Sequence, residues 1–203
     1  QKEVLRSEAK HAKAESQSIE YKDLGEATTS ANVKDVVIGI SPAFGLKLFQ
    51  TTAGHPLSDV LGVLMDAIKT RGLNPRIVRF MHTADTSFLG LSAARLSGSG
   101  VGIGLQAKGT AVIHQKDRLP HHNLELFSNA PITKLEHYRG MAANAAAYAL
   151  GEMPDPIVVP TRGEAMGARY HARTAMIYAI ESELTSEGAA PRAIDVVFKG
   201  KRA

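Results

Sequence analysis

The chain has 203 residues, no cysteine, no tryptophan and a formal net charge of +4, with 44% hydrophobic and 22% charged residues. This composition predicts one globular domain with a mostly aliphatic core, because aromatic residues make up only 5% of the chain. The lack of cysteine excludes disulfides and thiolate metal sites, and the modest charge disfavours a nucleic-acid partner. No apolar run approaches the roughly 20 residues that span a bilayer, so we expect no membrane partner and a cytoplasmic location.

The first 30 residues are polar, which predicts a flexible N-terminal extension (1–30) ahead of a domain at 31–203. A faint helical stripe within the extension is compatible with a surface helix or with a docking or targeting helix; it consists of Val4, Leu5, Ala9 and Ala12.

From Asp35 onward, short apolar runs alternate with helical patterns. Continuous apolar runs predict strands buried on both faces, and apolar residues at helical spacing predict helices between them. Asp85 stands where the N-cap of the second helix is expected. The predicted order of strand, helix, strand, helix, strand is typical of a parallel α/β sheet with right-handed crossovers. The predicted strands are 35–41, 76–80, 101–106 and 110–114, and the predicted helices are 58–71 and 86–96.

The second half of the chain begins with a predicted loop at 120–131. Thr133 to Glu136 has the pattern of a capping box and is expected to open an alanine-rich helix. A connector with several prolines follows it. The pattern then predicts a helix over about 169–184 and a closing strand at 193–198.

Two polar side chains follow neighbouring strands of the predicted sheet. Asp85 comes just after the second strand and Lys108 just after the third. In α/β sheets, ligands bind beyond the carboxyl ends of the strands, so we expect both residues at the same rim.

Five glycines lie between Gly98 and Gly109, with Lys108 among them. The stretch is no P-loop, because Lys108 is followed by glycine, and its glycines alternate unlike a dinucleotide fingerprint. Two interpretations remain open: a tight turn in a sheet, or bare backbone against which a flat ligand lies. In either case Lys108 is expected to reach a partner or an anionic or carbonyl-rich ligand.

The eight histidines are scattered, and His121-His122 is their only sequence cluster. Adjacent histidines rarely converge on one metal ion, so we expect no metal site. His114, in a predicted strand, is expected to be packed or hydrogen-bonded in the core. No catalytic constellation stands out, and the residues alone predict a ligand-binding or subunit-interface domain.

Several segments together closely resemble the medium (β) subunit of adenosylcobalamin-dependent diol and glycerol dehydratases, over about residues 33–185. The resemblance rests on 39–45, 95–100, 103–110, 112–115, 123–127 and the Tyr138-Arg139 helix. It implies an α/β fold, namely a Rossmann-like domain with a mostly parallel central sheet flanked by helices.

The resemblance also implies adenosylcobalamin as the cofactor, held against a large barrel subunit, with large and small subunits as partners in a dimer of heterotrimers. The complex would convert propane-1,2-diol or glycerol to an aldehyde plus water, and a reactivating factor would be a further partner. No catalytic residue is expected in this chain. A location inside a bacterial microcompartment is compatible with the family, and the N-terminal segment is the candidate address.

Carried over by position, the resemblance implies six cofactor-contacting residues. Asp85 and Lys108 would bond the peripheral amides or the phosphate tail of the cobalamin. Ser128 stands where the family has proline. Gly167 or Ala168 occupies the place of the family's arginine unless a short gap brings Arg169 into register. Tyr170 and Thr174 match tail-contacting positions.

Two alternatives belong to other classes. The first is the small subunit of a dehydratase-reactivating factor, which exchanges damaged cobalamin. Its chains lack the 123–127 loop and the long C-terminal part present here, so it is the weaker interpretation. The second is a stand-alone binding or regulatory domain.

Overall fold

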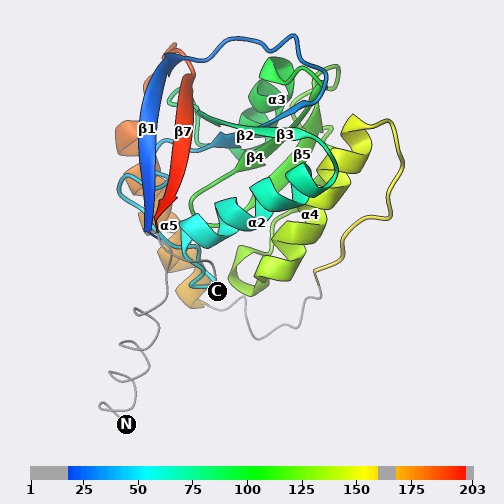
Figure 1. The fold of residues 1–203 in the computed structure, drawn as a ribbon. Helices are drawn as coiled ribbons and strands as arrows, with labels where there is room; N and C mark the ends of the chain where they lie inside the picture. Colours follow the sequence, from blue (N-terminus) through cyan, green and yellow to red (C-terminus); the bar gives the residue numbers. More distant parts are fainter. Residues whose placement is uncertain (1–17, 160–167, 200–203) are drawn as a thin grey trace.

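Seven strands form a single mixed sheet in the computed structural model, which describes residues 18–159 and 168–199 (Figure 1). The strand order is β1-β7-β3-β2-β4-β5-β6. The strands are β1 (Ser18–Glu26), β2 (Asp35–Ile40), β3 (Asn74–Arg79), β4 (Val101–Leu105), β5 (Ala111–Gln115), β6 (Glu125–Phe127) and β7 (Arg192–Lys199). The helices are α2 (Leu57–Thr70), α3 (Thr86–Leu96), the short 3-10 helix η1 (Ala130–Ile132), α4 (Leu135–Ala149) and α5 (Ala168–Leu184).

The elements predicted after Asp35 are present, and the α/β class is confirmed, but the expectation of a mostly parallel sheet is wrong. Only the β3–β2 and β2–β4 pairs are parallel, whereas the other four pairs are antiparallel. The physical reason is the short connection between β4 and β5. A parallel crossover needs a dozen or more residues, and the five residues between these strands permit only a hairpin.

Part of the predicted N-terminal extension belongs to the sheet. β1 pairs antiparallel with β7, and Asp23 forms an ion pair with Arg192 at 2.9 Å. The prediction of a flexible segment is therefore wrong for 18–26, because these residues complete a sheet edge with a strand far away in sequence. Residues 1–17, including the faint helical stripe, lie outside the described residues.

The predicted 120–131 loop also contains structure, because Glu125–Phe127 forms β6 against β5. At the start of α4 the expected Thr133–Glu136 capping box is not formed. The backbone N–H of Lys134 instead donates to His137 Nδ1 at 3.0 Å, and the Thr133 hydroxyl donates to Asn129 O at 2.8 Å.

Helices cover both faces of the sheet. α2 and α4 lie together on one face and α3 lies on the other (Figure 1). Alternate side chains of β2 divide between the two layers: Ile38 and Ile40 join the larger core beneath α2 and α4, whereas Val37 joins a smaller core with α3. This alternation explains why β2 reads as a continuous apolar run in the sequence.

The glycines of β4 serve this packing. A Cβ on Gly104 would lie 2.6 Å from Thr86 O and would also meet Gly90 N in α3, and a Cβ on Gly102 would meet backbone atoms of Ala93 and Ala94. The interpretation of these glycines as a flat platform for a ligand is therefore wrong. Their bare backbone is covered by α3, which approaches β4 closely because no side chain separates them.

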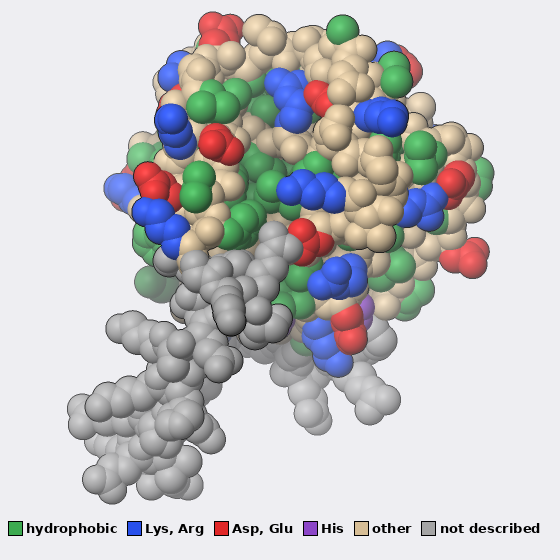
Figure 2. All heavy atoms as spheres, in the orientation of Figure 1, with side chains coloured by type: hydrophobic (Ala, Val, Ile, Leu, Met, Phe, Trp, Pro, Cys, Tyr) green, Lys and Arg blue, Asp and Glu red, His purple; other side chains and the backbone are tan. Residues whose placement is uncertain are grey.

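Within the described residues, no helix has both the length and the apolar character needed to traverse a bilayer. Lys and Arg side chains are interspersed with Asp and Glu on the face shown in Figure 2.

Candidate ligand site at the carboxyl edge of the parallel strands

A small, partly open pocket with a cavity volume of about 20 Å³ lies where the β3–α3 loop, the β4–β5 turn and α5 meet. Such a location, beyond the carboxyl ends of parallel strands, is where α/β sheets bind ligands. Its lining residues are Ala84, Gln106, Lys108, Thr174, Ile177, Tyr178 and Glu181.

Lys108 sits in the turn of the β4–β5 hairpin. Gly109 permits the turn by taking φ +104°, and the Tyr138 hydroxyl donates to Gly109 O at 2.6 Å. Thr52 fixes the backbone carbonyl of Lys108, because its N–H and its hydroxyl both donate to Lys108 O, at 2.9 and 3.0 Å. The turn thus holds the backbone of Lys108 on two sides, and the residue lines the pocket.

Burial lowers the pKa of the Lys108 ammonium below its ordinary 10.5, and the nearby Asp85 carboxylate opposes this shift. A partly desolvated ammonium interacts more strongly with a ligand oxygen than a fully hydrated one does. Lys108 is therefore suited to donate to a carbonyl or to an anion in the pocket.

Asp85 is the N-cap of α3, as predicted. Its Oδ1 accepts from the N–H groups of Ser87 and Phe88 at 2.8 and 3.1 Å. The residue is exposed and adjoins Ala84 of the pocket lining, and its charge acts on the Lys108 ammonium. The expectation that Asp85 and Lys108 lie at the same rim is confirmed, because Ala84, next to Asp85, lines the same pocket as Lys108.

Ser128 lies at the same edge but outside the pocket lining. The β5–β6 register pairs Ala111 with Phe127, which sets exposed Ser128 opposite Thr110, two residues after Lys108. Thr174 lines the pocket from α5, and its buried Oγ1 has no hydrogen-bond partner within the described residues. Arg169 and Tyr170 belong to the first turn of α5, and their side chains lie outside what the structure describes.

Two polar residues of the pocket were missed in the sequence. Gln106 immediately follows β4, is only 8% exposed, and donates from Nε2 to Ala84 O. Its Oε1 has no partner within the described residues. The polar residue directly after the glycine strand is a signal that could have drawn attention to it.

Glu181 is the second missed residue, and it ties α5 to the body. Its carboxylate accepts from the Ser41 hydroxyl and from the N–H of Ala43, the latter at 2.7 Å, and Ser41 Oγ in turn accepts from Ala107 N–H at 3.0 Å. Burial raises the pKa of Glu181, an effect that these hydrogen bonds and the charge of Arg79 partly offset. Glu181 follows Thr174 by two helical turns, a spacing that places both on one face of α5.

Arg79 completes the polar layer under this helix. Its Nη1 donates to three carbonyl oxygens of the loop after β2, those of Ser41, Pro42 and Phe44. The loop is thus held by a buried cation on one side and a buried carboxylate on the other. The geometry of this loop, residues 41–44, fixes the place where α5 packs against the edge of the sheet.

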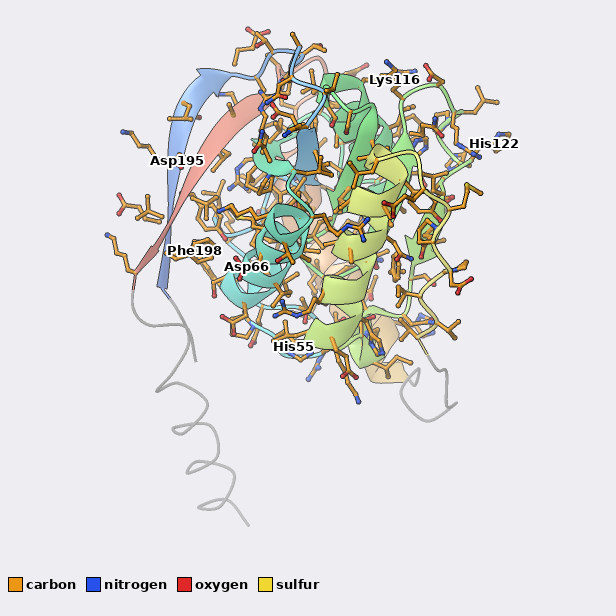
Figure 3. All side chains as sticks on the ribbon, turned by 45° about the vertical axis from the view of Figure 1, so that its right-hand side comes forward. His55, Asp66, Lys116, His122, Asp195 and Phe198 are labelled. Carbon is orange, nitrogen blue, oxygen red and sulfur yellow. The ribbon has the colours of Figure 1, made fainter. Side chains whose placement is uncertain are left out.

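None of the histidines in the described part of the chain lines the pocket. The ring of His121 packs edge-on against that of Phe88, with 5.9 Å between the ring centroids. His122 lies on an outer loop (Figure 3). His55 lies near the start of α4, where its Nε2 contacts Thr133 O at 3.1 Å (Figure 3). His114 is buried and hydrogen-bonded, as predicted. Among the residues that the structure describes, no group of three or more His, Cys, Asp and Glu side chains could hold a metal ion.

These features define an α/β protein with a small candidate ligand pocket at a sheet edge, lined by both apolar and polar side chains. A model of the dehydratase medium subunit family matches residues 41–155, more than half of the chain, and the chain belongs to this family. The family resemblance expected from the sequence is thereby confirmed. The matched segment contains Asp85, Gln106, Lys108 and Ser128, whereas α5 lies beyond it.

Two solved structures are also similar to the chain. A glycerol dehydratase reactivase matches with a TM-score of 0.48 and 19% identity, covering 59% of this chain and 94% of that chain. A diol dehydratase-reactivating factor complexed with ADP and Mg2+ matches with a TM-score of 0.43 and 17% identity, covering 62% of this chain and 95% of that chain. Similarity at this level assigns neither fold nor function.

Proposed function

We propose that this chain is the cobalamin-contacting medium subunit of an adenosylcobalamin-dependent diol or glycerol dehydratase. The observation that carries this proposal is the pocket lined by half-buried Lys108, Gln106 and Thr174, in which the buried Gln106 Oε1 and Thr174 Oγ1 have no hydrogen-bond partner among the described residues. Membership of the dehydratase medium subunit family supports the same assignment.

The size and chemistry of the pocket fit one peripheral group of a corrin. Its cavity volume of about 20 Å³ falls far below the roughly 300–1,000 Å³ of pockets that enclose a whole small ligand. It therefore suits a side group of a larger ligand that rests on the surrounding surface. A corrin is fringed with carboxamides that donate and accept hydrogen bonds, and the pocket offers both functions.

The proposed contacts divide by charge. Lys108 donates to an amide oxygen or to the phosphate tail, and Asp85 accepts from an amide N–H with the carboxylate oxygen that the helix cap leaves free. Ser128, Arg169, Tyr170 and Thr174 remain proposed contacts of the nucleotide tail. Bound adenosylcobalamin supplies the radical chemistry that converts a 1,2-diol or glycerol to an aldehyde and water. This chain holds the cofactor in position against a large subunit that contributes the diol site.

The test is co-expression of the full chain, tagged, with the large and small subunits of a diol or glycerol dehydratase. We expect the three chains to co-purify and to retain added cobalamin, visible as corrin absorbance after gel filtration. Recovery of the chain alone, without corrin absorbance, would contradict the proposal.

A parallel co-expression with the large subunit of a reactivating factor distinguishes the alternative. If the chain joins that subunit and not the dehydratase subunits, it belongs to the reactivating system. The same preparations, supplied with propane-1,2-diol and with glycerol, determine which substrate the complex prefers.

A further inference from the structure

The side-chain amide of Gln106 is held in one orientation. Its Nε2 donates to Ala84 O, and a flipped amide would set two acceptor oxygens against each other. The residue is 8% exposed, so water does not readily solvate its Oε1. Because this oxygen has no partner in the described residues, a buried acceptor remains unpaired beside the pocket that Gln106 lines.

An unpaired buried acceptor is costly, and a ligand that donates to it recovers that cost on binding. The neighbouring groups restrict the identity of such a ligand. Lys108 offers only donors, and the Thr174 hydroxyl, which has no partner among the described residues either, can donate or accept. Both carboxylate oxygens of Glu181 already accept hydrogen bonds, from Ser41 and Ala43.

A primary carboxamide matches this arrangement, because its N–H₂ donates while its carbonyl accepts. A carboxylate or a phosphodiester would satisfy Lys108 but would turn a lone pair, without a proton, toward Gln106 Oε1. We infer that Gln106 is a specificity-determining residue whose side-chain carbonyl accepts from a carboxamide N–H of the ligand and selects a carboxamide over an acid in this pocket. This inference rests on the proposed cobalamin function and names the group that the pocket takes.

The test uses the assembled dehydratase complex, with cyanocobalamin and with its derivatives in which one peripheral carboxamide is hydrolysed to the acid. The measured quantity is the ratio of dissociation constants, acid to amide, for each derivative. In Gln106→Leu the ratio for the derivative whose acid enters the pocket should fall at least about fivefold, because the unfavourable contact with the acid is removed. In Lys108→Met the same ratio should rise, because the acid loses its counter-charge.

Gln106→Met, which keeps an unbranched side chain of similar length, guards against misfolding of the Leu variant. Thr110→Val is the matched control, since Thr110 Oγ1 is another buried atom without a partner in the described residues but does not line the pocket. The control should leave the ratio unchanged.

An equal loss of affinity for amide and acid in both Gln106 variants would mean a structural role and would overturn the inference. An unchanged ratio for every derivative would overturn it as well, while cobalamin binding itself would still stand. If the unmodified complex binds no cobalamin, the proposed function fails first and the inference fails with it.

Discussion

At the scale of single residues, the charge of Lys108 is the feature most directly linked to the proposed ligand. The hairpin turn fixes its backbone, and its ammonium is half-buried with Asp85 nearby. A charge-assisted hydrogen bond in such a setting is worth about 1.5–3 kcal/mol, more than a bond at a fully hydrated surface.

Lys108→Ala should therefore weaken cobalamin binding by about ten- to a hundredfold while leaving subunit assembly intact. Lys116→Ala is the matched control, because Lys116 is an exposed lysine just beyond the other end of β5 (Figure 3). Equilibrium titration of the assembled complex with cyanocobalamin measures the effect. Equal affinity in the two variants would remove Lys108 from the site.

At the scale of elements, the contact between α3 and β4 depends on the absence of side chains. Gly104→Ala would press a methyl group against Thr86 O and Gly90 N, backbone atoms that cannot move aside independently. We expect it to lower the free energy of unfolding by about 1–3 kcal/mol, the usual cost of overpacking a core.

Gly62→Ala is the control for this prediction. Its Cβ would meet only Phe198, at an ordinary 3.6 Å, and it lies within α2. Alanine is the better helix former, so this variant should gain about 0.5–1 kcal/mol. Urea unfolding of the full chain measures both changes. The explanation fails if the two substitutions have effects of the same sign and size.

The attachment of α5 should depend on pH through Glu181. Because burial raises the pKa of this carboxyl above its ordinary 4.5, folding favours the protonated form. The stabilising contribution of protonated Glu181 to the free energy of unfolding is then fully present below pH 4.5. It is lost as the pH rises through the raised pKa of the folded state.

The stability of the wild-type chain relative to Glu181→Gln, measured by urea unfolding, should thus fall as the pH rises above 4.5. Glu183→Gln provides the matched control on the same helix. Glu183 makes an exposed ion pair with Lys47, with 65% of its own side chain exposed, so its removal should have little effect. A pH dependence that is the same in both comparisons would show that Glu181 is not responsible.

At the scale of the whole molecule, the helices differ in how firmly they are held. α2 and α4 bury several apolar residues in the main core, whereas the only residue of α5 buried among those described from 171 to 184 is Glu181. Met176 and Tyr178 of α5 are 68% and 58% exposed. Elements with little buried apolar area open locally at low free-energy cost.

Amide hydrogen exchange of the isolated chain should therefore be much faster in α5 than in α2 and α4. In the assembled complex with cobalamin, exchange in α5 should slow, because the proposed ligand bridges it to the β4–β5 turn. Mass spectrometry of peptic fragments reports both states. Equal protection of the three helices in the isolated chain would contradict this description.

Local patterns in the sequence predicted much of the element content. Val37 to Ile40, the α2 periodicity and the Asp85 cap depend on neighbours close in the chain, so the rules for strands, helices and caps apply directly. The rim shared by Asp85 and Lys108 also followed, because the strand before each residue was predicted correctly.

The direction of the strands and the other half of the site required the tertiary structure. β1 is defined only by its pairing with β7, more than 160 residues later, and β6 only by its pairing with β5. Gln106 and Glu181 were recognised as pocket residues only from long-range contacts. Gln106 Nε2 donates to Ala84 O, and the Ser41 hydroxyl donates to the carboxylate of Glu181 in α5. Such long-range contacts leave no periodic signal in a single sequence.

The glycine stretch at 98–109 shows both what the sequence determines and what only the tertiary structure determines. The sequence by itself determined that the backbone of β4 is bare and that Lys108 follows it, which limited the stretch to a turn or a close approach. Only the tertiary structure decided that α3 occupies the bare face and that Lys108 turns toward α5. The physical reason is that a missing Cβ permits close contact but does not specify the neighbour, which the packing of the whole sheet selects.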